Sequence, residues 1–349
     1  MIHDTDGFKS TGLTRASSAE TCSSCDLYVL KTEKSRLIER ARSSVSRVDF
    51  GPYSDLAYRW APIHYQYVNL ASPRVDLLCA VNFDGDWDTS NSRENMGKFD
   101  LVPVIYYATA ETKTHYFLLF ACYHADDRGL SDHENDLEGC LLIIERGDVE
   151  KEEERLLGMI TVGHQDFWAY VYKSRLRAGE IMVRGKIYME RFQGIEHPMT
   201  RQISGKHGFY PWRGAPWYAF WEKHPWYAFW NGRDSQKQVG VRYVPANEAK
   251  MPAIEEIKSF SKTEANYVLI DVAGDEGFWK RRDDPLTFRD HSFNASTSRS
   301  ANPPWEWDDK DDRFPAGTLF NDPAKIANKY FRGYKNFSYD YTKRMEERR

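Results

Sequence analysis

Short hydrophobic runs, separated by glycine, proline, aspartate and asparagine, recur along most of this chain. They dominate residues 55–245, and no long stretch of helical periodicity lies between them; examples are 75–81, 101–107, 114–123 and 159–163. Many short strands without intervening long helices are typical of a β-sandwich or barrel. The pattern therefore predicts an all-β or β-rich α+β fold, namely an antiparallel β-sandwich with short peripheral helices.

The same pattern divides the chain into three parts. We expect residues 1–54 to form a flexible leader and a short amphipathic helix, residues 55–335 a single β-sandwich domain, and residues 336–349 a charged C-terminal tail. Within the domain, residues 323–331 are predicted to be helical. An aspartate stands at the N-cap of this segment and a proline at its first position, where both residue types are favoured.

The most informative motif places one imidazole and two carboxylates within six residues. His133, Asp136 and Glu138 come immediately before the apolar run 140–144, which reads as a strand. Asp136 and Glu138 are two residues apart, so they project from the same face of an extended backbone. Oxygen ligands with one nitrogen suit Mg²⁺, Ca²⁺ or Mn²⁺. A solvated acidic turn before a strand is the alternative.

Two further histidines lie at the ends of predicted strands. His164 follows the run 159–163, and His207 stands in a glycine-flanked segment after Gly205, where the backbone can approach other groups closely. Loops collect at the two ends of a β-sandwich. We therefore expect His164 and His207 to face the same cavity as the acidic motif.

In the order of these residues the chain resembles the superfamily of the necrosis- and ethylene-inducing cytolysins and a related vacuolar protein-sorting family. His133, Asp136 and Glu138 match the H-x-x-D-x-E skeleton of the cytolysin metal motif, while the other side chains of that motif differ. The resemblance implies a divalent metal held by these three residues and an upstream aspartate. Asp127 matches that aspartate best, and Asp126 is the alternative.

Composition narrows the classes of partner. The net charge is −4 and the pI about 6.2, and no stripe of lysine and arginine is present, which argues against nucleic acid. No window approaches the ~20 apolar residues of a membrane span. The first residues lack the basic and apolar regions of a signal peptide. The chain is therefore cytoplasmic as written, or secreted if a leader has been removed.

Five cysteines are present. Cys22 and Cys25 form a CxxC without a second pair, so a closed zinc site is not expected. Cys79, Cys122 and Cys140 fall in apolar runs and are predicted to be buried thiols.

A tandem repeat of the sequence PWYAFW occupies residues 216–221 and 225–230. Aromatic side chains at this density either pack on the core or form an exposed platform for lipid or carbohydrate. Tryptophan and tyrosine favour membrane interfaces, so Trp217–Trp230 is a candidate for peripheral membrane contact.

Two functions from different classes remain open. In the first, the cation held by Asp127, His133, Asp136 and Glu138 binds a polar lipid or carbohydrate headgroup. In the second, the protein is a metal-dependent hydrolase of an ester or phosphoester, in which the cation activates water and His207 or His164 transfers the proton. The position of His207 relative to the metal distinguishes the two.

Overall fold

A computed structural model describes residues 53–128, 133–147, 154–163, 166–172, 183–212, 239–288, 302–309, 314–332, 334 and 337–347. Three of the predicted features lie outside these residues. They are the expected leader up to residue 52 with its two cysteines, the single residue His164, and the tandem aromatic repeat.

In the described part of the chain the strands form one thirteen-stranded sheet. The strands are β1 Ile63–Tyr67, β2 Val104–Thr112, β3 His115–Asp127, β4 His133–Glu145, β5 Arg155–Gly163, β6 Asp166–Val171, β7 Val183–Lys186, β8 Met189–Phe192, β9 Ile195–Gln202, β10 Phe209–Pro211, β11 Gly240–Pro245, β12 Glu264–Asp271 and β13 Tyr341–Lys343. Neighbouring strands follow the order β10-β9-β1-β11-β12-β2-β3-β4-β5-β6-β7, with β13 beside β2 and β8 beside β9.

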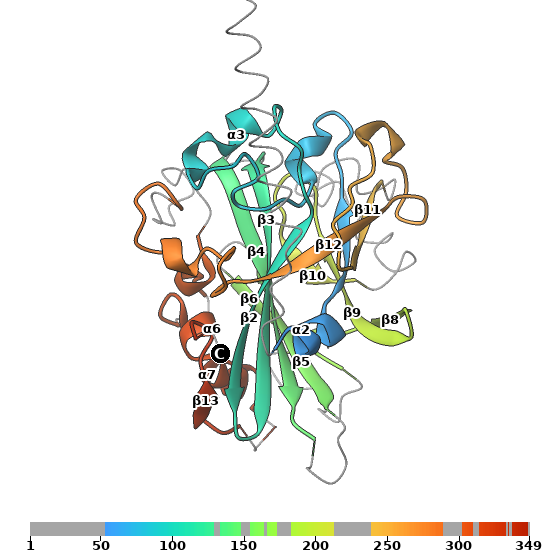
Figure 1. Ribbon diagram of the computed structural model, residues 1–349. Helices are drawn as coiled ribbons and strands as arrows, with labels where there is room; N and C mark the ends of the chain where they lie inside the picture. The colour runs from blue at the N-terminus through green and yellow to red at the C-terminus, as the bar shows by residue number, and fades with distance from the viewer. Residues whose placement is uncertain are drawn as a thin grey trace, which may run out of the picture.

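This sheet is mixed and curled, whereas the sequence pattern predicted a sandwich of mostly antiparallel sheets (Figure 1). Strand β1 is parallel to β9, β11 to β12, β12 to β2, and β6 to β7, while the remaining pairs are antiparallel. The β-rich class is confirmed, but the antiparallel sandwich is not. Parallel neighbours require long crossover connections between distant segments, and the hydrophobic pattern of each segment carries no information about such pairing.

Strands β3 and β4 form the centre of the molecule and run along its length (Figure 1). They pair antiparallel over their whole extent, from His115 opposite Glu145 to Asp127 opposite His133. Nearly all of their side chains are buried on both faces, which explains the almost continuous apolar runs in this part of the sequence. Cys79, Cys122 and Cys140 are buried free thiols, as predicted.

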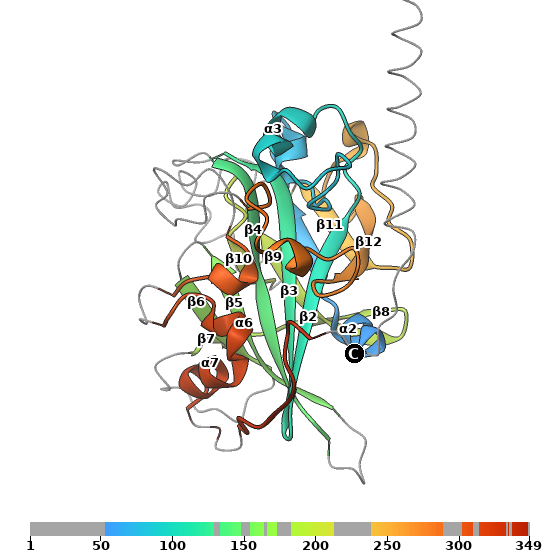
Figure 2. The same ribbon diagram turned by 60° about the vertical axis from the view of Figure 1, so that its left-hand side comes forward.

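Helices are few and short. They are α2 Ser54–Trp60, α3 Ser92–Asn95, α6 Thr318–Asn321 and α7 Pro323–Tyr330, with 3₁₀ turns η1 Pro73–Asp76, η2 Thr89–Asn91, η4 Ile254–Glu256, η5 Trp279–Arg281 and η6 Pro304–Glu306. Helix α7 confirms the predicted helix, and it buries Ile326, Ala327 and Tyr330. Helices α6 and α7 lie on one flank of the sheet and α2 on another (Figure 2). Among the described residues, no helix has the length and apolarity to span a membrane.

Two segments differ from their predicted structure. Residues 75–81 were expected to form a strand, but they begin in η1 and continue without regular structure, although 77–81 are buried. An apolar run shows that a segment is buried without showing that it pairs with a neighbour. At the other end, β13 pairs with β2, so residues from the expected charged tail extend the sheet.

Candidate metal site

The end of the β3–β4 pair carries the motif that the sequence singled out. Strand β4 begins at His133, so the motif lies within the strand, and Asp136 stands directly opposite His124 on β3. Residues three apart on a regular strand face opposite sides. Here, Asn135 has a φ of 49°, in the left-handed region that asparagine tolerates better than most residues. This break in the alternation allows His133 and Asp136 to face the same side.

The opposite side of this strand end packs against η2 and α3. Glu134 accepts a hydrogen bond from the Arg93 backbone N–H (2.7 Å), and Asn135 donates its side-chain N–H to the Thr89 carbonyl (2.8 Å). The Arg93 guanidinium also donates to the His133 carbonyl at 3.0 Å. Arg93 thereby holds the strand end that carries Asp136.

Fully buried Asp126 forms a second connection at this strand end. It accepts hydrogen bonds from Nε of Arg93 (2.6 Å) and from Nε of Arg128 (2.7 Å), one on each carboxylate oxygen. Asp126 is therefore engaged by two guanidinium groups, and the adjacent Asp127 is the aspartate that approaches Asp136.

His207 reaches the same place from the turn between β9 and β10. Its φ is 47°, and Gly205 in the same turn has a φ of 79°. A Cβ atom on Gly205 would lie 2.7 Å from the Arg128 carbonyl oxygen, so a side chain would clash there. The Arg128 N–H donates to the Gly205 carbonyl at 2.8 Å. The turn is thus attached directly to the end of β3.

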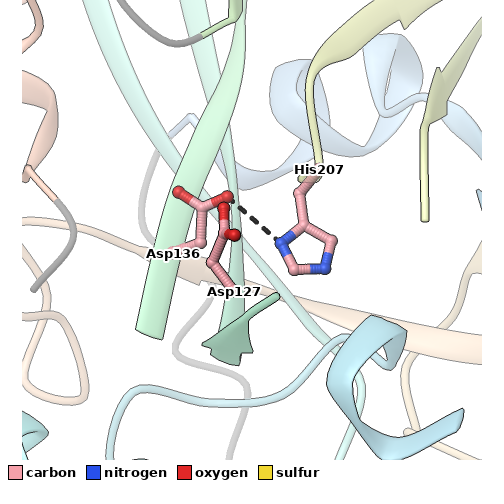
Figure 3. Close-up of side chains that lie close together, drawn as sticks. All are labelled: Asp127, Asp136 and His207. Atoms are coloured by element: carbon pink, nitrogen blue, oxygen red, sulfur yellow. Dashed lines mark hydrogen bonds and ion pairs between the residues drawn. The ribbon is translucent and has the colours of Figure 1, made fainter. Parts of the chain in front are cut away.

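The imidazole of His207 is fully buried and lies between two carboxylates. Its Nδ1 is 3.1 Å from Oδ2 of Asp136, and its Nε2 is 3.3 Å from Oδ1 of Asp76. Asp127, Asp136 and His207 each offer an atom within 4.8 Å of the other two (Figure 3). We call these three residues the Asp–Asp–His group.

Asp76, at the end of η1, fixes the far side of the His207 ring. Besides the ion pair, this buried carboxylate accepts hydrogen bonds from the backbone N–H groups of Asn69 (2.7 Å) and Gly205 (2.6 Å) and from the Ser204 hydroxyl (2.9 Å). These donors fix the Asp76 side chain in place, and Asp76 in turn sets the orientation of the imidazole.

The neutral side chain of His124 packs against the face of the His207 ring. The His124 and His207 rings stack with centroids 3.8 Å apart, and Nε2 of His124 is 3.1 Å from Oε1 of Gln202. The amide of Gln202 in turn donates to the His207 carbonyl at 2.7 Å. Burial, reinforced by the charge of His207, lowers the pKa of His124 well below its usual value. His124 therefore remains uncharged beside the charged ring.

The electrostatics of the group follow from these contacts. Burial alone lowers the pKa of His207, but the hydrogen bonds and negative charges of Asp136 and Asp76 outweigh it and raise that pKa to about 10. Burial and the negative charge of Asp136 raise the pKa of Asp127 to about 7, against the opposing positive charges nearby. Two buried carboxylates this close need positive charge between them.

The donor set fits a divalent cation. Two ligand oxygens on one Mg²⁺ or Ca²⁺ ion are at most about 5 Å apart, because each bond is about 2.0 to 2.6 Å long. The atoms of the Asp–Asp–His group satisfy that limit. Carboxylates with one imidazole suit Mg²⁺, Mn²⁺ or Ca²⁺ better than a thiophilic metal.

The structure brings together some of the expected residues and rearranges others. Asp127 and Asp136 belong to the group, and His207 joins them, although it was expected to act in proton transfer. His133 lies beside the group: its Nε2 is 3.5 Å from Asp127, but its Nδ1 contacts the Asn135 carbonyl at 2.7 Å, so the ring is turned back onto its own strand. Glu138 is buried further along β4 and is not one of the three.

Sequence reasoning missed two supporting residues. Asp76 stands in an apolar run that was read as a strand, and the only signal for it was a charged residue among apolar neighbours. His124 comes directly after the predicted strand 114–123, but its stacking on His207 depends on the strand register.

No protein-family model matches the chain, and no curated protein is significantly similar to it. Among solved structures, the non-toxic HaNLP3 protein is 16% identical, covers 48% of this chain and 75% of its own, and has a TM-score of 0.26. Necrosis and Ethylene inducing Protein 2, from the causal agent of cocoa's Witches Broom disease, is 14% identical over 48% and 72% of the two chains, with a TM-score of 0.26. NLPPya in complex with glucosamine is 14% identical over 46% and 69%, with a TM-score of 0.23. One of these structures carries the name of the necrosis- and ethylene-inducing proteins, but at such scores the likeness assigns neither a family nor a function to this chain.

Proposed function

We propose that this protein binds a divalent cation at the Asp–Asp–His group and uses the cation to bind a polar lipid or carbohydrate headgroup. The observation that carries the proposal is the approach of two buried carboxylates and one imidazole to within 4.8 Å at the end of the central strands. Placing like charges together in a buried site is costly unless a cation compensates them. Mg²⁺ or Ca²⁺ would do so and would keep further coordination positions for a ligand.

The same geometry supports binding rather than hydrolysis. A general base must be able to accept a proton near neutral pH. In the metal-free protein the pKa of His207 is raised to about 10, and a carboxylate faces each ring nitrogen. A bound cation would replace the proton on Nδ1, while Nε2 would stay against Asp76, so neither nitrogen would be left to act as a base. The other expected base, His164, lies outside the described residues. Among the described residues, the histidines around the group are therefore suited to binding the cation and to fixing the geometry of its site, and not to proton transfer.

Metal binding is tested directly by titrating Mn²⁺ into the full chain and detecting bound ion by electron paramagnetic resonance. We expect one Mn²⁺ per chain, and we expect Asp136→Asn to weaken its binding by at least about tenfold, because a charged ligand is lost. Asp340→Asn is the matched control, since Asp340 is an exposed carboxylate paired with Lys113. Equal Mn²⁺ affinity in wild type and Asp136→Asn would contradict the proposal.

Headgroup binding is tested with vesicles of phosphatidylcholine, with and without a glycosylated lipid, in a flotation assay. Binding that requires Mg²⁺, is lost with a chelator and is lost in Asp136→Asn supports the proposal. Vesicle binding that is indifferent to chelator would show that the cation does not mediate it.

A further inference from the structure

The charges around the Asp–Asp–His group are separated by depth. The two aspartates of the group, Asp127 and Asp136, are buried, and so are the neighbouring Asp76 and Asp126. The basic side chains at the same strand end are nearer the surface: the side chains of Arg93 and Arg128 are 42% and 46% exposed, and Lys206 is half-buried. Glu134 is half-exposed and accepts the Arg93 N–H on the side of α3, where Asp88 and Glu94 are further acids that are not buried. Arg128 and Lys206 are connected to the β9–β10 turn, whereas these partly exposed acids lie on the side of η2 and α3.

Arg128 and Lys206 lie where three segments meet: the end of β3, the loop that contains Ser72, and the β9–β10 turn. Arg128 follows Asp127, and its guanidinium lies between Asp126 (2.7 Å) and the Ser72 hydroxyl (3.5 Å) of the loop that leads to Asp76. The hydrogen bond from the Arg128 N–H to the Gly205 carbonyl fixes the turn in which Lys206 precedes His207. Lys206 is the residue before His207 in that turn, and its positive charge opposes the rise in the pKa of Asp127.

A cation bound by two carboxylates has its charge balanced by them, and its remaining positions are commonly filled by water or by phosphate oxygens. A guanidinium group is suited to phosphate because it donates two parallel hydrogen bonds, and an ammonium group adds a point charge. A neutral sugar would accept hydrogen bonds from these side chains but would gain no charge pairing from them. Of the headgroups named in the proposed function, the basic side chains thus favour one that carries phosphate over a neutral sugar.

We propose that the group bound at this site is phosphoryl, held by the cation on one side and by Arg128 and Lys206 on the other. This inference rests on the proposed function, because it names the chemistry of the ligand that the cation binds. A phospholipid headgroup and a free phosphorylated molecule share that chemistry.

The test is isothermal titration of inorganic phosphate into the full chain saturated with Mg²⁺. Wild type binds phosphate, and Arg128→Gln and Lys206→Gln each weaken this binding, by about tenfold or more for Arg128, as expected for loss of a charge-assisted hydrogen bond. Lys113→Gln is the matched control, because it removes one positive charge next to the opposite end of β3 and leaves phosphate affinity unchanged. Mn²⁺ affinity is measured on each variant and changes less than twofold in Lys206→Gln.

Vesicles distinguish the two sources of the phosphoryl group. Flotation with vesicles containing phosphatidic acid, but not with phosphatidylcholine alone, supports a lipid headgroup, and phosphate binding without flotation supports a free phosphorylated ligand. Mn²⁺ binding without phosphate binding, or phosphate affinity equal in wild type and both variants, overturns this inference and leaves the proposed function standing. Absence of Mn²⁺ binding overturns both.

Discussion

In the metal-free protein, His207 supplies the positive charge that the neighbouring carboxylates need. The ring has carboxylates at both nitrogens, no exposure to solvent and a pKa raised to about 10. In the absence of metal, the imidazolium itself partly neutralises Asp136 and Asp127. A bound ion would take over that task at the carboxylates, while Asp76 would keep the ring in place from behind.

Asp76 is the residue whose replacement tests this arrangement. Asp76→Asn would place an amide N–H₂ among the backbone N–H groups and the hydroxyl that now donate to the carboxylate, and it would remove the ion pair with His207. We expect the free energy of unfolding to fall by about 3 kcal/mol, since removing one partner of a buried ion pair leaves the other uncompensated. Urea denaturation measures it.

Asp340→Asn removes an exposed carboxylate from its ion pair with Lys113 and is expected to cost at most about 1 kcal/mol. A loss in Asp76→Asn no larger than in this control would show that the buried carboxylate does not stabilise the turn that carries His207.

At the level of elements, the decisive feature is the start of β4. The sequence predicted a strand from residue 140 with the acidic motif at its entrance, whereas β4 already begins at His133 and contains the motif. Polar residues before an apolar run look like a loop when each residue is judged by its own hydrophobicity. They are buried here because α3, η1 and the β9–β10 turn cover this strand end, and those segments are remote in sequence.

The spacing of the motif depends on the backbone of Asn135. Asn135→Gly and Asn135→Ala both lose the hydrogen bond to the Thr89 carbonyl, so the difference between them reports the φ of 49°. We expect the glycine variant to be more stable by about 1 kcal/mol, because alanine is disfavoured in the left-handed region. We also expect glycine to retain Mn²⁺ affinity better, since the alternation that aims Asp136 is kept. Thermal or urea unfolding together with Mn²⁺ titration measures both effects, and an alanine variant as stable as the glycine variant would contradict the left-handed conformation.

For the whole molecule, the sequence correctly predicted the β-rich class and the helix at α7, and it placed the candidate site at the end of the central strands. It did not predict which strands are neighbours. Strand β9 lies beside β1, and β10 beside β9, although long segments separate both from β1. Strand β10 also contacts β5, which is remote from it in the order of the sheet. Such contacts arise from the curl of the sheet. The composition and periodicity of β10, a three-residue strand, contain nothing that would reveal them.

Stacked aromatic side chains connect β6 to β10, two strands that the curl of the sheet brings together. The Trp168 ring of β6 lies 5.1 Å from the Tyr210 ring of β10 at an angle of 14°, with the Arg184 guanidinium 5.3 Å from Trp168 and the Arg201 guanidinium 5.3 Å from Tyr210. Aromatic stacking and cation–π contacts each contribute about 0.5 to 2 kcal/mol. The stack therefore attaches the β9–β10 hairpin, whose turn carries His207, to the far part of the sheet.

Trp168→Leu should loosen that hairpin selectively. We expect stability to fall by about 3 kcal/mol, as for other losses of a large buried ring. We further expect faster hydrogen exchange at β9 and β10 and weaker Mn²⁺ binding, because the His207 turn loses its support. Trp305→Leu is the matched control: Trp305 packs on Phe278, Trp279 and Phe320, away from the hairpin. It should lower overall stability while leaving exchange in β9 and β10 and Mn²⁺ affinity close to wild type. If the two variants change hydrogen exchange in the hairpin equally, the stack acts only through global stability, and the curl of the sheet does not hold the site together.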